Sequence, residues 1–301
     1  MKNASVPSAY MIPNCKPFLT GNELKYLKEA IETEWLSSTG PFVDRLEDLF
    51  ANYHGVSAAA AVSSGTAAIH LGLISIGVRT GDLVLCPTLT FIGSANPIHY
   101  CGADPVFLDI EKESLNLDPK CLENFLQSKT ERRYEGIFHK QSGRRIAALI
   151  VVHLYGNPAP LEPILELCRE YNLPVLEDAA ESLGARYKGR LVGTIGDIGC
   201  FSLNGNKVIT SGGGGIVISR NAESIEQSKH LSTQAKIDKF EFNHDEVGFN
   251  YRLSNLCAAV GVAQMEHLNS FIERKRKHAT QYKTAFVQHN KWEILQEPKE
   301  C

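Results

Sequence analysis

The sequence lacks a long hydrophobic run, a surplus of basic residues and any closely spaced pair of cysteines. Its most apolar stretch, at 146–155, is much shorter than the roughly 18 residues that cross a bilayer. Residues 1–15 have neither the basic start nor the apolar core of a secretory signal. We therefore expect no membrane partner and no export by such a signal.

Charge and cysteine content exclude further classes of protein. The 31 lysines and arginines against 34 aspartates and glutamates give a net charge of −3, which argues against a nucleic-acid partner. The eight cysteines are scattered without a CxxC pair, so the sequence predicts neither a disulfide framework nor a metal site. Such cysteines, several of them inside apolar runs, are typical of a protein in the reducing cytoplasm.

What the sequence does contain is an alternation of two patterns. Seven short apolar runs are typical of buried strands, and amphipathic stretches with helical spacing stand between most of them. This alternation predicts an α/β fold with a mainly parallel, seven-stranded sheet flanked by helices. The predicted strands are 58–62, 83–86, 105–108, 146–153, 174–177, 198–202 and 215–219. The predicted helices are 23–34, 42–53, 66–76, 92–100, 119–127 and 161–171.

Two remaining stretches carry separate predictions. The polar, basic stretch at 128–145 is interpreted as a solvated surface loop, and the pattern from 254 to about 288 predicts one long helix. The chain is accordingly divided into an N-terminal segment at 1–20, a large α/β domain at 21–253, and a long helix with a short tail at 254–301.

Two motifs stand where strands end. The Ser63-Ser64-Gly65-Thr66 motif follows a predicted strand and opens a helix, where free N–H groups and the helix dipole favour an anion; an ordinary helix cap is the alternative. Asp178 stands at the carboxyl end of another strand, where open α/β sheets place their ligands. Its carboxylate could hold a protonated ring nitrogen or a metal, or simply cap a helix.

The third motif surrounds Lys207. This lysine stands among small polar residues at 199–211, and a lysine held out of water there can act as a nucleophile or a base. Four glycines at 212–215 precede a strand rather than a helix, which is the wrong order for a nicotinamide or ATP loop. An anion site, a strand-end aspartate, a serine and a lysine together fit a pocket for pyridoxal 5′-phosphate (PLP).

Eight motifs in order along 10–290 then give the chain a close resemblance to the DegT/DnrJ/EryC1/StrS aminotransferases, PLP enzymes of fold type I that act on nucleotide-linked keto sugars. They are GPF at 40–42 with Glu47, SGT at 64–66, PTLTF at 87–91, HLYG at 153–156, EDAAE at 177–181, GTIGD at 193–197, FSLNGNK at 201–207 and GFNYR at 248–252. The NGNK form at 204–207, with Glu181, is similar to the branch that aminates C4 of UDP-4-keto-6-deoxy-N-acetylhexosamines for bacterial surface glycans.

The resemblance implies a role for each matched residue, with L-glutamate as the amino donor. Lys207 and Asp178 are the implied catalytic residues, as the Schiff-base lysine and the partner of the pyridine nitrogen. Asn250 is implied to reach the cofactor phosphate of a neighbouring subunit, so that the active unit is a homodimer. The other implied cofactor contacts are Gly65, Thr66 and Ser202 to the phosphate, Phe91 to the ring and Glu181 beside O3′. The implied sugar contacts are His153, Tyr155 and Arg252.

Two departures from the family leave alternatives open. Glu181 stands where members often have His or Gln, so we expect a proton shared between it and the cofactor's O3′. Members continue into a small C-terminal domain, which we expect to be truncated here, with weak turnover of the sugar. One alternative function is a PLP-dependent sugar dehydratase of the same fold. Such dehydratases have histidine in place of the lysine, so Lys207 argues against this alternative. A non-catalytic paralogue that binds PLP or a sugar nucleotide, or serves as a partner subunit, is the alternative from another class.

Overall fold

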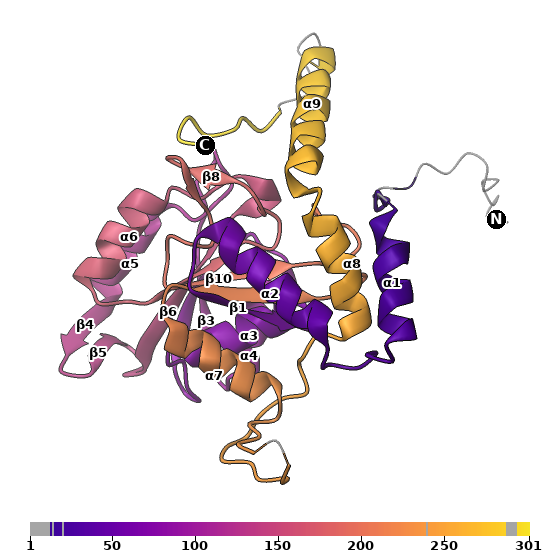
Figure 1. The fold of residues 1–301 in the computed structure, drawn as a ribbon. Coiled ribbons are helices and arrows are strands. Elements are labelled where there is room, and N and C mark those ends of the chain that lie inside the picture. Colours follow the sequence, from indigo (N-terminus) through magenta and orange to yellow (C-terminus); the bar gives the residue numbers. More distant parts are fainter. Residues whose placement is uncertain (1–12, 14, 20, 239, 287–293) are drawn as a thin grey trace, which may run out of the picture.

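One open sheet organises the chain (Figure 1). The computed structural model describes residues 13, 15–19, 21–238, 240–286 and 294–301. The strands follow the order β1-β11-β10-β7-β6-β2-β3, and β5 pairs with β6 at its start. Strands β10, β7, β6, β2 and β3 run parallel, whereas β11 runs antiparallel to both of its neighbours. The prediction of a mainly parallel sheet in an α/β fold is confirmed, and each of the seven predicted strands is present.

The strands match the predicted runs to within two residues. Their bounds are β1 Ala58–Val62, β2 Leu83–Pro87, β3 Asp104–Leu108, β6 Arg145–Val152, β7 Val175–Asp178, β10 Ile198–Ser202 and β11 Gly215–Ser219. Four short strands were not predicted: β4 Thr130–Arg133, β5 Gly136–His139, β8 Arg186–Tyr187 and β9 Arg190–Leu191. The last two pair with each other as a separate ribbon.

Helices cover both faces of the sheet. On one face lie α3 Gly65–Ser75, α4 Ile92–Tyr100 and α7 Ala222–Ser232, whose buried residues share one apolar cluster. The other face is covered by α2 Pro41–His54, α5 Pro119–Lys129, α6 Leu161–Glu170 and α8 Asn255–Met265. Helices α1 Asn22–Glu32 and α9 Leu268–Phe286 extend that layer, with α1 packed on α8. The structure adds α7, which was not predicted.

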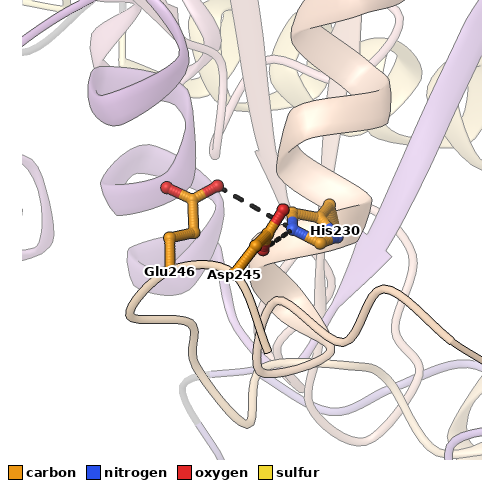
Figure 2. A group of neighbouring side chains, drawn as sticks. All are labelled: His230, Asp245 and Glu246. Atoms are coloured by element: carbon orange, nitrogen blue, oxygen red, sulfur yellow. Dashed lines mark hydrogen bonds and ion pairs between the residues drawn. The ribbon is translucent and has the colours of Figure 1, made fainter. Parts of the chain in front are cut away.

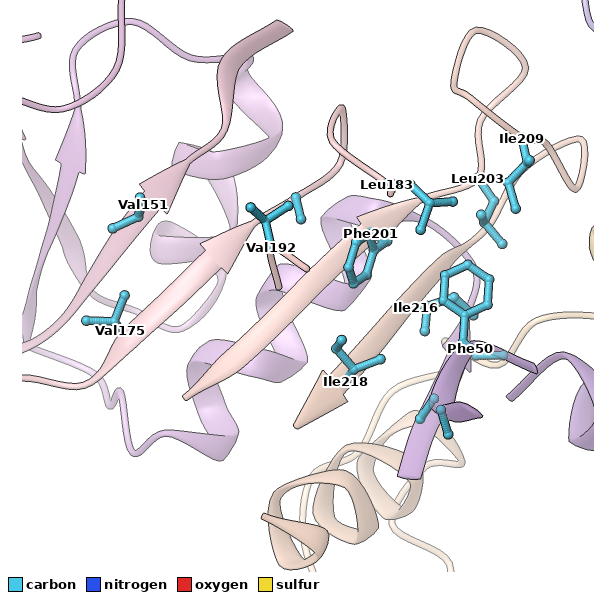
Figure 3. Packing of buried hydrophobic residues seen from close by; sticks show 14 of the residues in the cluster. Phe50, Val151, Val175, Leu183, Val192, Phe201, Leu203, Ile209, Ile216 and Ile218 are labelled. Atoms are coloured by element: carbon cyan, nitrogen blue, oxygen red, sulfur yellow. The ribbon is translucent and has the colours of Figure 1, made fainter. Parts of the chain in front are cut away.

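Burial on both faces explains why the strands are continuous apolar runs rather than alternating ones. In β11, Ile216 and Ile218 belong to the cluster under α2, while Val217 between them belongs to the cluster under α3. Figure 3 shows the first of these layers, where the ring centroids of Phe50 and Phe201 lie 6.0 Å apart.

The segment at 128–145 is mostly solvated surface, as interpreted, but it is not a loop. The segment forms the β4–β5 hairpin, which pairs with β6 through Ile137 and Ile146. Both isoleucines are buried, while the arginines that made the stretch look like a solvated loop point outward, Arg132 to Glu170 and Arg133 over the Phe138 ring. A single buried apolar residue in a basic stretch is too weak a pattern to predict a strand.

The prediction of one long helix from 254 to 288 is also wrong. Helix α8 ends at Met265 and α9 begins at Leu268. Glu266, between them, accepts hydrogen bonds from Tyr26 Oη at 2.7 Å and from Arg45 at 2.7 Å, so contacts with α1 and α2 fix the break. The last predicted residues, 287 and 288, lie outside the described residues, as do 1–12, 14 and 20 of the predicted N-terminal segment. No helix in the described ranges is long and apolar enough to cross a membrane.

Two buried histidines make the stability of this fold dependent on pH. Burial lowers the pKa of His54 and of His70 from 6.5 to about 4. The unfolded chain therefore takes up two protons between pH 6.5 and 4 that the folded chain does not. This difference lowers the free energy of unfolding by up to about 1.4 kcal/mol per pH unit for each histidine.

We therefore expect urea unfolding to show full stability above about pH 7 and a loss near 2 kcal/mol per histidine by pH 5. His70→Phe, which keeps a ring among Tyr100, Phe249 and Tyr251, should halve this loss. His278→Gln, which removes an exposed histidine, is the control. An equal pH dependence in wild type and His70→Phe would contradict the assignment.

Candidate active site

A cavity of about 250 Å³ lies at the carboxyl ends of β6, β7 and β10, the edge where open parallel sheets bind ligands. His153 follows β6, Asp178 ends β7 and Ser202 ends β10. The cavity thus gathers side chains that are up to 144 positions apart in the chain, from Ser63 to Lys207. The predicted site residues that line it are Gly65, Thr66, Phe91, His153, Asp178, Glu181, Ser202 and Lys207.

One wall of the cavity is the N-terminal end of α3. The Ser64 hydroxyl accepts a hydrogen bond from the Ala67 N–H at 3.0 Å and caps the helix. The N–H groups of Gly65 and Thr66, as the first two of the helix, have no intrahelical acceptor and stand at the positive end of its dipole. A Cβ on Gly65 would lie 2.9 Å from that of Ser202, so glycine permits the close approach of helix and strand. This wall is suited to a phosphate group.

Asp178 forms the opposite, buried part of the site. Its carboxylate accepts a hydrogen bond from Ser94 Oγ at 2.5 Å and one from the Ala180 N–H at 3.1 Å. Burial raises the pKa of Asp178, and the Ser94 and Ala180 hydrogen bonds and the charge of Lys207 oppose that rise. A carboxylate held in this way can bind a cationic N–H group that enters the cavity.

The sequence did not single out Ser94. Its hydroxyl lies 2.6 Å from that of Thr90, so one hydroxyl group from the first turn of α4 and one from just before the helix are linked to Asp178 of β7. The available signal was its position three residues after the predicted Phe91, in the first turn of a helix. Only the tertiary structure shows that this turn meets the end of β7.

Lys207 is held inside the cavity by Glu181. Its Nζ lies 3.3 Å from Glu181 Oε1, and Glu181 Oε2 accepts the Tyr155 N–H at 2.8 Å. The loop that carries Lys207 is closed by backbone hydrogen bonds from Lys207 N to Asn204 O and from Leu203 N to Gly214 O. The lysine side chain is 17% exposed, so its amine can meet a ligand while most of its stem is covered.

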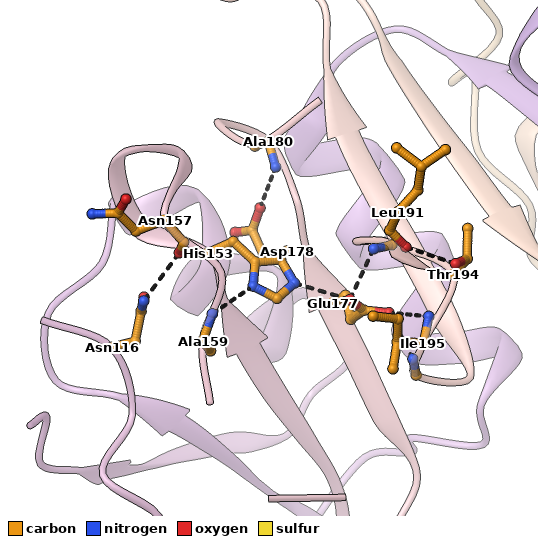
Figure 4. A network of polar contacts seen from close by, with 12 residues as sticks. Asn116, His153, Asn157, Ala159, Glu177, Asp178, Ala180, Leu191, Thr194 and Ile195 are labelled. Carbon is orange, nitrogen blue, oxygen red and sulfur yellow. Dashed lines mark hydrogen bonds and ion pairs between the residues drawn. The ribbon is translucent and has the colours of Figure 1, made fainter. Parts of the chain in front are cut away.

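A second polar network adjoins the cavity through His153, which lines it (Figure 4). His153 Nδ1 accepts the Ala159 N–H at 3.0 Å, so the ring proton is on Nε2, which donates to Glu177 Oε2 at 2.9 Å. Glu177 also accepts three N–H groups of the 193–196 turn, at 2.6 to 2.8 Å. Burial alone would raise the pKa of Glu177, but His153 and these N–H groups hold it below its usual value.

This network limits what His153 can do. The residue lines the cavity, but it is fully buried and both ring nitrogens are already bonded. The ring therefore contributes shape to the wall rather than a free donor or acceptor. Glu177 fixes both the ring and the turn, a role that the sequence did not indicate.

Three predicted residues do not line the cavity of this chain. Tyr155 is 68% exposed with a left-handed φ of 57°, and Asn250 is exposed. Arg252 is half-buried and forms an isolated bridge with Val62. The segment at 250–252 nevertheless lies beside the phosphate-type wall, since the Ser63 N–H donates to Tyr251 O at 2.7 Å. Phe91 does line the cavity, yet the residue as a whole is 73% exposed.

His230, Asp245 and Glu246 lie together outside the cavity (Figure 2). His230 Nε2 is 2.7 Å from Asp245 Oδ1 and 3.8 Å from Glu246 Oε1, and both carboxylates are exposed. Their ligand atoms are close enough to surround a cation, a cluster that the sequence did not predict. Exposed groups of this kind are also ordinary surface ion pairs, so the cluster carries no functional assignment.

Comparison with known sequences agrees with this geometry. The model of the DegT/DnrJ/EryC1/StrS aminotransferase family matches residues 17–300. A Bacillus subtilis (strain 168) protein named as a pyridoxal phosphate-dependent aminotransferase, EpsN, is 45% identical over 269 residues, covering 89% of this chain and 67% of its own. GDP-perosamine synthase of Escherichia coli O157:H7 is 41% identical, covering 90% and 70%. The chain thus spans about two thirds of the length of these relatives.

Solved structures share the fold. The aminotransferase TlmJ from Streptoalloteichus hindustanus superposes with a TM-score of 0.84 at 30% identity, covering 96% of this chain and 75% of TlmJ. Helicobacter pylori PseC, an aminotransferase involved in the biosynthesis of pseudoaminic acid, superposes with a TM-score of 0.81 at 24% identity, covering 92% and 71%. The predicted fold type is confirmed by these likenesses.

Proposed function

The chain belongs to the DegT/DnrJ/EryC1/StrS aminotransferase family, whose members are PLP-dependent, and on that premise we propose that it transfers the amino group of L-glutamate to a nucleotide-linked keto sugar. The observation that carries the proposal is the convergence of three features on one cavity. These are the anion-binding end of α3, the buried carboxylate of Asp178 and the amine of Lys207.

The polar, charged and aromatic groups that line the cavity fit the cofactor. The free N–H groups of Gly65 and Thr66, with the Ser202 hydroxyl, would hold its phosphate, and Asp178 would hold the protonated pyridine nitrogen. Phe91 offers a ring face at the open side, and Glu181 would lie beside O3′. When bound, PLP supplies an electron sink that makes protons at the substrate's amine-bearing carbon removable.

The side chains of this chain would then hold the cofactor and move the proton. Lys207 would hold the cofactor through its Nζ, and the same amine would move a proton at the amine-bearing carbon of the substrate. Glu181 keeps the lysine amine inside the cavity by its 3.3 Å contact. Asp178, buried and hydrogen-bonded, would keep the pyridine nitrogen protonated.

The proposed substrate is a 4-keto-6-deoxy sugar on a nucleoside diphosphate, for bacterial surface glycans. Residues 204–207 and Glu181 favour a UDP-linked N-acetylhexosamine aminated at C4. Relatives named GDP-perosamine synthase, at 39% to 41% identity, support a GDP-linked sugar as well. Both nucleotides therefore belong in the assay.

We further propose that the active unit is a homodimer in the cytoplasm. Asn250, exposed and outside this chain's cavity, is then available to the cofactor phosphate in a partner's site, and Tyr155 and Arg252 to a sugar at that interface. The eight cysteines are all unpaired, which supports a reducing compartment.

The assay has two steps. Adding L-glutamate to the PLP-loaded protein should change its visible absorption spectrum and release 2-oxoglutarate, whereas D-glutamate, equal in size and charge, should not. UDP- or GDP-linked 4-keto-6-deoxy sugar should then restore the first spectrum and yield an amino sugar, with the carbon identified by NMR. A PLP-loaded protein that responds to neither addition would contradict the proposal and favour the non-catalytic alternative.

A further inference from the structure

A groove of about 560 Å³ adjoins the candidate active site. Lys207 lines both the groove and the cavity, so the two share the loop that carries this lysine. The rest of the groove is lined by the N-terminal segment at 15–19, by Gln264 of α8 and by α9, which extends beyond the sheet (Figure 1). Segments far apart in the sequence therefore meet beside the loop that carries Lys207.

The groove concentrates positive charge in a chain whose net charge is −3. No carboxylate is among its described lining residues. On α9 the lining residues are at 271, 274, 275 and 278, the spacing of one helix face. We call this site the basic groove; its cationic members are Lys16, Lys207, Arg274 and Lys275, with His278 at the same face.

The cations on the groove's rim are available to a ligand. In the described part of the chain, Lys16, Arg274 and Lys275 form no ion pair, whereas the neighbouring Arg276 pairs with Glu297 at 2.8 Å. Unpaired cations clustered beside a cavity, rather than spread over the surface, create a field that attracts anions.

The groove is also held in shape. Gln264 donates a hydrogen bond to Phe18 O at 2.9 Å, and the Arg274 guanidinium lies 4.6 Å from the centroid of the Phe18 ring. Phe18 in turn packs edge-on against Phe271 of α9 at 5.9 Å. Because these contacts fix the segment against α8 and α9, a ligand need not order the groove when it binds.

We propose that the basic groove binds the diphosphate of the nucleotide sugar, an inference that rests on the proposed function. The sugar's keto carbon must reach Lys207, so its diphosphate must lie one sugar ring away from this lysine. The cavity itself offers the carboxylates of Asp178 and Glu181, which repel a second anion, and its α3 wall is taken by the cofactor phosphate. The groove that shares Lys207 offers cations that match a diphosphate.

Calorimetric titration of the PLP-loaded protein with UDP and with GDP tests this inference. Lys275→Gln and Lys16→Gln remove one cation each from two different segments, and each should weaken nucleotide binding by about tenfold. Lys277→Gln is the matched control, since it makes the same change on α9 outside the groove. The control should stay within about twofold of wild type, and binding should weaken with added salt less steeply in the two groove variants.

Kinetics separate this inference from the proposed function. The two groove variants should raise KM for the nucleotide sugar by the same factor while leaving the response to L-glutamate unchanged. Unchanged nucleotide affinity and unchanged KM in both variants would overturn the groove assignment and leave the proposed function standing. Tenfold weaker UDP or GDP binding in a protein that aminates no sugar would keep the groove and reject the function. Inorganic pyrophosphate should compete with UDP and GDP, because all three would place a diphosphate in the groove. Pyrophosphate that binds but is not displaced by UDP or GDP would overturn the inference.

Discussion

Lys207→Ala should abolish transamination, with a fall of at least about a thousandfold. The side chain of Lys207 is 17% exposed in the cavity, with its Nζ 3.3 Å from Glu181, and it is the amine that both holds the cofactor and moves the proton in the proposed function. Alanine removes both capacities together. The measurement is 2-oxoglutarate release from L-glutamate, and borohydride reduction followed by peptide mass spectrometry identifies the modified lysine in the wild type.

The matched control is Lys188→Ala, which removes an exposed lysine that pairs with Glu162. It should retain activity and borohydride labelling at Lys207. If Lys207→Ala still formed a borohydride-stable adduct with the cofactor, the covalent role would belong to another lysine, and the assignment of Lys207 would be wrong.

The same variant tests the shared active site. When a Lys207→Ala chain and an Asn250→Ala chain exchange subunits at random, half of the dimers are hybrids, and each hybrid has one unmutated site. Mixing should therefore restore about a quarter of wild-type activity. If mass spectrometry showed subunit exchange but no activity was recovered, Asn250 would act in the site of its own chain, and the shared site would be contradicted.

The parts of the site that the sequence predicted are those that depend on local position. Asp178 and Ser202 stand at strand ends and Ser64 to Thr66 open a helix, and these patterns place groups at one edge of a parallel sheet before any contact is known. Lys207 could be singled out because it stands among small polar residues, between Ser202 and a run of glycines. In each case the local pattern and the tertiary position agree.

The parts that were missed depend on contacts between distant segments. Ser94 is an ordinary residue of a helical stretch until α4 brings it to Asp178, 84 positions away. Glu177 reads as the interior of an apolar strand, yet it holds His153 and the 193–196 turn. The break between α8 and α9 similarly depends on Tyr26 and Arg45, which hold Glu266 from two other helices. These contacts leave no pattern in the spacing of residues along the chain, so the sequence alone could not predict them.

Asp178→Asn should keep the cofactor but lower the rate by about a hundredfold to a thousandfold. Asparagine has the shape of aspartate and leaves Lys207 and the α3 wall intact, so binding of the cofactor persists. It lacks the charge that keeps the pyridine nitrogen protonated, and that charge acts in a buried site where water cannot replace it. The measurement is the single-turnover rate with L-glutamate. A rate within a few-fold of wild type would show that Asp178 is not the nitrogen's partner.

Ser94→Ala tests the same carboxylate with a milder change, because it removes only one of the hydrogen bonds to Asp178. The Ser94 hydrogen bond lowers the pKa of Asp178, so its loss should raise that pKa, and the acid limb of the pH–rate profile should move to higher pH. The rate at neutral pH should fall about tenfold, less than in Asp178→Asn, because the carboxylate remains. Ser182→Ala is the control, because among the described residues that buried hydroxyl has no hydrogen-bond partner. A profile for Ser94→Ala that coincides with the control's would mean that Asp178 does not titrate in the rate-limiting step.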